Sequence, residues 1–160
     1  MKRQESVKVK GMFRLQITED GDGKTRIVGD TGWKHNQITD LGFNQYLVSA
    51  LGSISGSKYV SHMAIGTGGA PATSDTTLAG EQSVRAAVTA ATSSASKTVR
   101  FTATFASAAS FVTASKNISN IGLFNTSTAA GGTLFAGNTY TSSACATNQN
   151  VNATYDIIFS

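Results

Sequence analysis

Residues 60–71 read Val-Ser-His-Met-Ala-Ile-Gly-Thr-Gly-Gly-Ala-Pro, and the rest of the chain is organised around this stretch. The apolar run over residues 60–65 is typical of a buried strand. The glycines that follow are expected to end it, because glycine adopts the positive φ angles that other residues avoid. Pro71, the only proline, cannot donate a backbone hydrogen bond to a central strand. The stretch therefore predicts a core strand that leads into a surface loop.

A long loop follows this strand, and it is expected to be fixed against the protein. The residues after Pro71 are polar or small until Leu78 supplies an apolar anchor. The loop is predicted to owe its shape to Gly66, Gly68, Gly69, Pro71 and Leu78. Just beyond it, Glu81 and Arg85 lie four residues apart, and a structural ion pair between them is expected.

The composition indicates one β-rich domain over residues 1–160 whose surface favours assembly. A chain of this length can bury roughly two-thirds of its unfolded surface. Charged residues make up 14% of the sequence, against about a quarter in typical soluble domains. Hydroxyl, amide and methyl groups therefore dominate the surface, which suits packing against neighbouring subunits.

The net charge of +4 is concentrated at the N-terminus. Residues 1–14 form a predicted basic arm or edge strand that carries five cations against one acid, whereas residues 117–155 carry no charge. Such an arm suits an acidic partner surface or, equally, a solvated strand face. Nucleic acid is a poorer fit, because stacking aromatic residues are not interleaved with the cations. The candidate subunit contacts are Lys2, Arg3, Lys8, Lys10 and Arg14.

Alternating apolar and polar residues predict most of the strands. Over residues 7–18, one face carries Val7, Val9, Gly11, Phe13, Leu15 and Ile17, which indicates a half-buried strand. An Asp-Gly-Asp-Gly turn at residues 20–23 leads into a second strand. With residues 60–65, further strands are expected near residues 83–91, 98–105, 118–124, 134–140 and 151–159, which gives about eight.

One short α-helix is expected at about residues 39–51. Thr39 can cap its N-terminus, and Asp40 lies near the positive end of the helix dipole. Leu41, Leu47, Val48 and Leu51 form an apolar stripe that should lie on a sheet. Since strands and helices do not alternate, the predicted fold is an antiparallel β-sandwich, jelly-roll-like or barrel-like, with this one helix.

The sequence contains no motif typical of an enzyme. His35 and His62 are the only side chains that could act as a base near neutral pH, and neither adjoins a nucleophile motif. The single Cys145 excludes an intrachain disulfide and a cysteine-based metal site. The Asp-Gly-Asp-Gly turn lacks the terminal glutamate of a calcium loop, and a nucleotide-binding glycine pattern would need glycine at Pro71. We therefore expect no catalytic residue, metal or cofactor.

No targeting or membrane-spanning segment is expected either. No run approaches the ~20 apolar residues of a membrane helix. The basic N-terminus lacks the apolar core of a signal peptide. These features predict a protein that is made in a cytoplasm and remains there or is built into a larger assembly.

The order of several motifs over residues 33–159 resembles that of small structural proteins of tailed bacteriophages. More distantly, it resembles the particle-anchoring N-terminal domain of some tail fibres. In that pattern the glutamate and the arginine are usually three residues apart, whereas four separate them here. The motifs that carry the resemblance are Thr39-Asp40-Leu41-Gly42, Met63-Ala64-Ile65-Gly66-Thr67-Gly68, Pro71, Thr77-Leu78, Glu81, Arg85 and Ile121-Gly122-Leu123-Phe124.

This resemblance implies a non-enzymatic virion subunit that is assembled in the cytoplasm of a bacterial host. Its partners would be the major capsid protein or tail and baseplate proteins, with a homo-oligomer expected and a trimer one candidate. Capsid decoration, as a cement protein, is favoured slightly over a tail adaptor, because the last predicted strand ends beside Ser160 without a fibrous extension. The alternative is a carbohydrate- or receptor-binding sandwich in which Trp33 and the four tyrosines stack on sugars.

Overall fold

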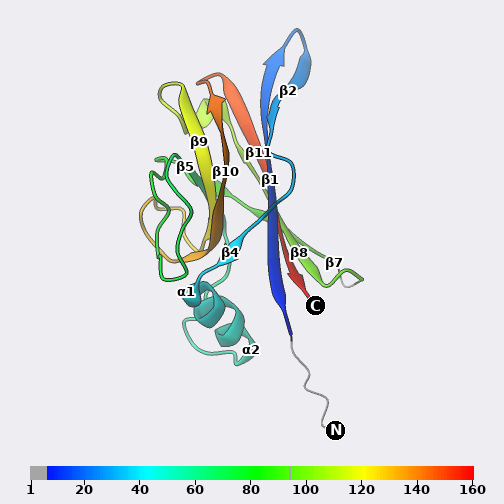
Figure 1. Cartoon of the computed structure of the whole chain (residues 1–160), viewed down its shortest axis with the longest axis vertical. Coiled ribbons are helices and arrows are strands. Elements are labelled where there is room, and N and C mark those ends of the chain that lie inside the picture. Colours follow the sequence, from blue (N-terminus) through cyan, green and yellow to red (C-terminus); the bar gives the residue numbers. More distant parts are fainter. Residues whose placement is uncertain (1–6, 94) are drawn as a thin grey trace.

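The protein is a sandwich of two antiparallel sheets, as seen in a computed structural model that describes residues 7–93 and 95–160 (Figure 1). The first sheet has the order β2-β1-β11-β8-β7, with β3 also paired to β1, and the second has the order β4-β10-β9-β5-β6. The first sheet comprises β1 (Val9–Gly21), β2 (Lys24–Asp30), β3 (Lys34–His35), β7 (Thr89–Ser93), β8 (Thr98–Phe105) and β11 (Gln149–Phe159). The second comprises β4 (Gln37–Ile38), β5 (His62–Gly66), β6 (Ala86–Ala87), β9 (Lys116–Phe124) and β10 (Leu134–Cys145).

The chain crosses between the sheets at both edges of the sandwich. On one side β3 pairs with β1 and β4 with β10, so residues 34–38 join the two sheets. On the other side β6 pairs with β5 and β7 with β8. The prediction of a single strand over residues 83–91 is therefore wrong. Val88 lies at the crossing, where its N–H donates to the Ser61 carbonyl (3.0 Å) while its side chain packs on the core.

The alternating strands of the first sheet place their apolar faces as predicted. In β1, Phe13, Leu15 and Ile17 are buried, while Lys10 is exposed. Val7, predicted on the same apolar face, precedes the strand and is 77% exposed, so the prediction is wrong there. Phe101, Ala103 and Phe105 of β8 and Tyr155 and Ile157 of β11 are buried on the same face. Phe13 stacks on Tyr155, with ring centroids 5.7 Å apart, at the centre of this layer.

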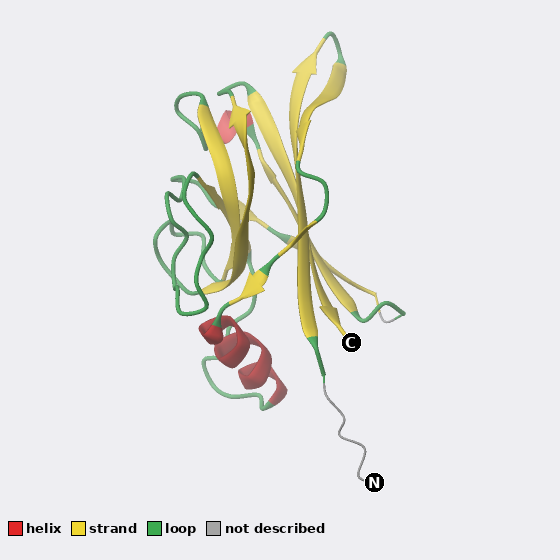
Figure 2. Cartoon of the chain, in the orientation of Figure 1, coloured by secondary structure: helices red, strands yellow, loops and turns green. Residues whose placement is uncertain are grey.

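The second sheet is buried on both faces over residues 63–66, 120–124 and 134–137, where the loop after β5 covers its outer side (Figure 2). Leu78 anchors this loop, as predicted, in a small cluster with Ala64, Phe124 and Leu134. The opposite face of the sheet packs on the first sheet through Met63, Ile65 and other core residues. Strands buried on both faces have near-continuous apolar sequences, which explains the uninterrupted run before Gly66.

The glycines of this loop are needed for space, and the expected positive φ angle is wrong for Gly66, Gly68 and Gly69. A Cβ on Gly66 would lie 2.5 Å from Asn120 Oδ1 and 2.8 Å from the Ala79 carbonyl oxygen. A Cβ on Gly68 would lie 2.5 Å from that same oxygen. No atom lies within 4 Å of the corresponding position on Gly69. The loop thus approaches the backbone of residues 79–80 too closely for a side chain at two of the three positions.

The helical segment forms where predicted but buries a different face. Thr39 caps it, since its hydroxyl accepts a hydrogen bond from the Gly42 N–H (2.9 Å). Its middle is a π-helix, Phe43–Val48, between short α-helical turns α1 (Asp40–Gly42) and α2 (Ser49–Leu51). The wider π-helical turn shifts every later side chain around the axis. Tyr46 enters the core, and Leu47 packs against it as predicted, whereas the predicted apolar stripe is wrong at Val48 and Leu51, which are exposed.

The N-terminal strand is interior to its sheet from Met12 onward, so the expectation of an edge strand is wrong for residues 12–14 of the arm. β1 pairs with β11 along Val9–Glu19 on one side, whereas on the other side β3 pairs with Met12 and Phe13 and β2 pairs with residues 16–21. Two-sided pairing follows from the hairpin turn at Asp22-Gly23, where both φ angles are positive (51° and 72°). Lys2 and Arg3 lie outside the described residues.

Two variants of β1 test the assignment of its buried face. We expect Phe13→Asp to destabilise the fold by more than the about 3–5 kcal/mol that removal of a core phenylalanine costs, because it also buries an unpaired charge. Lys10→Asp places the same charge on the exposed face and should unfold at nearly the wild-type urea concentration. Circular dichroism during urea unfolding measures both, and equal stability of the two variants would contradict the assignment.

Candidate functional site

Exposed large apolar side chains are concentrated in the helical segment and the loop after it. Leu51 is 91% exposed and Tyr59 is 75% exposed, and Ile54 lies between them in sequence. Phe43 and Val48 on the helical segment are each about half exposed. Exposed apolar side chains gathered on one segment are typical of interaction sites in soluble proteins. We call these five side chains the apolar patch.

Beside the patch is an apolar groove of about 200 Å³. The helical segment that borders it lies at one end of the sandwich (Figure 1). The helical segment forms one wall, and the ends of β8 and β11 form the other. A second apolar hollow between the helical segment and Phe159 continues it. The groove is lined by Tyr46, Leu47, Ala50, Lys58, Tyr59, Val60, Val99, Phe101, Phe135, Ile157 and Phe159.

Polar contacts hold the helical segment beside this groove. The Tyr46 hydroxyl donates to the Thr133 carbonyl oxygen, and burial raises the pKa of that hydroxyl. Lys58 Nζ donates to Gln45 and to Thr133 Oγ1, the latter at 2.9 Å. Lys58, the one cation of the groove lining, is thereby engaged in hydrogen bonds within the protein. The groove can therefore recognise a partner mainly through apolar contact.

Of the cations predicted as subunit contacts, Lys10 and Arg14 lie on the outer face of the first sheet, and neither lines the groove. Arg14 is already paired with Asp30, since its Nε donates to Asp30 Oδ1 at 3.0 Å and its Nη2 donates to Asp30 Oδ2. The hydrogen bond from Arg14 holds the pKa of the Asp30 carboxyl well below its usual range. Of the five predicted cations, Lys8 and Lys10 are described as exposed side chains, and no acidic partner of either is recorded among the described residues.

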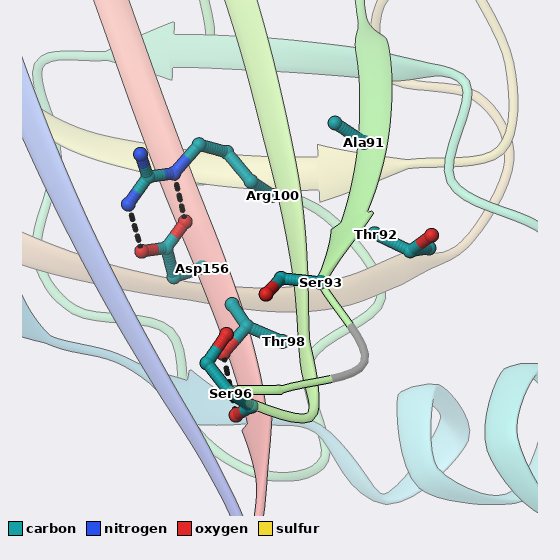
Figure 3. A pocket seen from close by; sticks show the side chains of 7 residues that line it. All are labelled: Ala91, Thr92, Ser93, Ser96, Thr98, Arg100 and Asp156. Atoms are coloured by element: carbon teal, nitrogen blue, oxygen red, sulfur yellow. Dashed lines mark hydrogen bonds and ion pairs between the residues drawn. The ribbon is translucent and has the colours of Figure 1, made fainter.

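The same outer face carries a polar depression of about 460 Å³ next to the β7–β8 hairpin (Figure 3). Arg100 on β8 reaches Asp156 on β11 through two hydrogen bonds of 2.8 and 2.7 Å. The Arg100 guanidinium also lies 5.7 Å from the centroid of the Trp33 ring. Ser93, Ser96 and Thr98 contribute hydroxyl groups to the rim. The depression is open and polar, and its charged groups are satisfied by each other.

The loop residues singled out in the sequence build a rigid cover for the second sheet. Asn120 Nδ2 donates to the carbonyls of Gly69 (3.1 Å) and Ala79 (2.8 Å), and Ser119 donates to that of Gly68 (2.9 Å). Pro71 is buried against β10, with its Cγ 3.1 Å from where a Cβ on Gly137 would lie. These contacts indicate a structural role for the loop.

Glu81 and Arg85 form a buried ion pair at the base of the loop. Arg85 donates to both Glu81 oxygens, at 2.5 and 3.1 Å, and to the Thr126 carbonyl at 3.0 Å. The side chains are 7% and 0% exposed, and the guanidinium lies 3.6 Å from the Phe124 ring centroid. The Ala130 N–H also donates to Glu81 (3.3 Å). The pair therefore ties the loop to residues 125–133.

The two histidines are separated in the structure. His35 is exposed on β3, whereas His62 on β5 shares a 2.8 Å hydrogen bond with the adjacent Ser61 hydroxyl. Burial lowers the pKa of His62, and the nearby Arg85 charge adds to this effect. Within residues 7–93 and 95–160, no carboxylate is recorded on the His62 ring and no cluster of three metal-binding side chains is found. Nor does this part of the chain contain a helix long and apolar enough to cross a bilayer.

Removal of one charge from the buried pair should be costly. We expect Glu81→Gln to lower the free energy of unfolding by about 3–5 kcal/mol, because Arg85 is left buried and unpaired. Asp30→Asn breaks the exposed pair with Arg14 and should cause a much smaller loss. Replacing both partners, as Glu81→Leu with Arg85→Met, should recover most of the stability. Urea unfolding measures the stability of these three variants. Equal losses for Glu81→Gln and Asp30→Asn would contradict the structural role of the Glu81–Arg85 pair.

Comparisons with protein-family models, with curated proteins and with solved structures find no match. The function is therefore inferred from the surface of this chain and from the motifs in its sequence.

Proposed function

We propose that this protein is a non-enzymatic structural subunit of a tailed-bacteriophage particle and that it attaches to its neighbours through the apolar patch and groove. The exposure of the apolar patch is the observation that carries the proposal. Protein interfaces bury aromatic and aliphatic side chains at their centre, which fits Leu51, Ile54 and Tyr59. The resemblance in motif order to phage structural proteins supports the identity of the assembly.

Capsid decoration is the placement that we favour, with a tail or baseplate adaptor as the second. A decoration subunit has to bind a pre-formed shell by surface contact. The groove provides apolar contact on a rigid support, because Thr39, Tyr46 and Lys58 fix the helical segment by hydrogen bonds. Lys10 on the exposed face of β1, and Lys8 just before this strand, would add electrostatic steering toward an acidic neighbour. The partners in this proposal are the major capsid protein or tail proteins.

Carbohydrate binding is less well supported by the positions of the aromatic side chains. Tyr46, Tyr140 and Tyr155 are buried, which leaves Trp33 and Tyr59 as exposed rings. Trp33 lies by Arg100 on the outer face of the first sheet, whereas Tyr59 lines the groove. The two rings therefore belong to different surfaces, and a shared stacking platform is not formed.

Immunogold labelling can test the virion assignment and its placement. An antibody raised against the purified chain would be applied to particles released by the bacterial strain that encodes it. We expect label on particle heads in many copies if the protein decorates the capsid, and label at one end of the tail if it is an adaptor. Purified particles that carry no label, and no peptide of this chain by mass spectrometry, would overturn the proposal.

A matched pair of isoleucines tests the contact surface. Ile54 in the apolar patch and Ile27 on β2 are each 59% exposed, so Ile54→Asp and Ile27→Asp change comparable side chains. We expect Ile54→Asp to weaken binding to particles that lack the protein by on the order of tenfold or more, because a charge must be desolvated at the interface. Ile27→Asp should bind like the wild type. Equal binding of both variants in a co-sedimentation assay would place the contact elsewhere.

A further inference from the structure

Within residues 7–93 and 95–160, the edge strand β7 has no partner on one side of its backbone. Among these described residues Thr89–Ser93 pairs only with β8, and all five of its residues are exposed. It forms one edge of the first sheet, next to β8 (Figure 1). Its neighbours across the ladder include Val99 and Phe101, which line the apolar groove.

The hydrogen-bond alternation identifies which groups of β7 face outward. Lys8 and Ser160 exchange two backbone hydrogen bonds (2.6 and 2.8 Å), and the Phe159 N–H donates to the Lys97 carbonyl (3.0 Å). Along an antiparallel strand, the backbone groups of successive residues point alternately to the two neighbouring strands. Ser160 therefore points to β1 and Phe159 to the β8 side, and this alternation can be followed through the register of β11 with β8 and of β8 with β7. It directs the backbone groups of Thr89, Ala91 and Ser93 toward β8. The N–H and C=O groups of Ala90 and Thr92 therefore point to the free edge.

This edge lacks the features that normally prevent pairing with another chain. Natural edge strands are protected by charged residues, proline, bulges or very short length. The opposite edge of the sheet follows this rule, since β2 carries Lys24, Arg26 and Asp30. The edge strands β4 and β6 of the second sheet have two residues each. By contrast, β7 has the sequence Thr-Ala-Ala-Thr-Ser, with five residues and no charge or proline.

We infer that two copies of this protein pair through β7, antiparallel and around a two-fold axis at Ala91, so that the first sheets of both copies become continuous. In this register Ala90 faces Thr92 of the second copy and Thr92 faces Ala90 of the second copy. These pairs exchange four backbone hydrogen bonds, which use all the outward groups identified above. The same edge of a second copy is complementary to this one, because a two-fold axis places each outward N–H opposite an outward C=O.

Side chains at the axis also suit a second copy. Ala91 would face Ala91 of the second copy in a non-hydrogen-bonded pair, where Cα atoms lie only about 4.5 Å apart. A methyl side chain fits this spacing. The nearest cation across the ladder is Arg100, which is paired with Asp156 by two hydrogen bonds and so adds little repulsion between the copies. This inference does not depend on the virion assignment.

Cysteine cross-linking of the full chain tests the register. Ala91→Cys places two thiols opposite each other across the axis, in the kind of pair that can form a disulfide. Thr89→Cys is the matched control, because Thr89 would face Ser93 and the two introduced thiols would lie roughly 13 Å apart along the ladder. The native Cys145 is buried and should not compete. Under mild oxidation we expect Ala91→Cys to form covalent dimers on the order of tenfold faster than Thr89→Cys.

Lysine substitutions at the same two positions provide an independent measurement. Ala91→Lys sets like charges directly opposite each other and should raise the dimer dissociation constant on the order of tenfold or more, whereas Thr89→Lys should have a smaller effect. Both side chains are exposed, so neither change should alter the fold. Analytical ultracentrifugation measures the constants. A wild-type protein that remains monomeric at high concentration, or equal cross-linking of the two cysteine variants, would overturn the inference.

Discussion

Burial of both faces of the second sheet is the constraint on which the rest of this structure depends. One face packs on the first sheet, and the loop anchored by Leu78 covers the other. The loop can lie flat only because Gly66 and Gly68 lack a Cβ and because Asn120 satisfies its carbonyl groups. Without this cover, Phe124 and Leu134 would lose Leu78 as an apolar partner. The loop is therefore part of the core although it lies at the outside of the fold.

The first sheet is built differently, and this difference creates the surface available for contact. Its outer face is polar, with Arg100 paired to Asp156 and Arg14 paired to Asp30. At one end its inner face diverges from the second sheet, and the helical segment fills only part of the space. A groove remains because the π-helical turn commits Tyr46 to the core and leaves Leu51 outside. The same rearrangement that completes the core thus exposes the apolar patch.

Electrostatics has a local role in this chain. The buried Glu81–Arg85 pair orders two loops on the second sheet, and its hydrogen bonds to the backbone compensate for the loss of water. The exposed Arg14–Asp30 pair is accessible to solvent and to salt, so it fixes side-chain positions more than it stabilises the fold. Residues 117–155 carry no charge, so their contacts within the fold rest on backbone pairing and apolar burial.

The sequence by itself determined the antiparallel sandwich, the buried faces of β1, β8 and β11, the Thr39 cap and the Leu78 anchor, because period-two alternation and capping are local signals. Only the tertiary structure decided that β1 is interior, that residues 86–93 change sheets at Val88, and that Gly66 and Gly68 are needed for close approach. It also decided the candidate site. Helical periodicity placed Leu51 in the core, but a π-helical turn depends on what packs against it, and Tyr46 reached Thr133, 87 residues away in sequence. Such long-range contacts leave no periodic trace in the sequence.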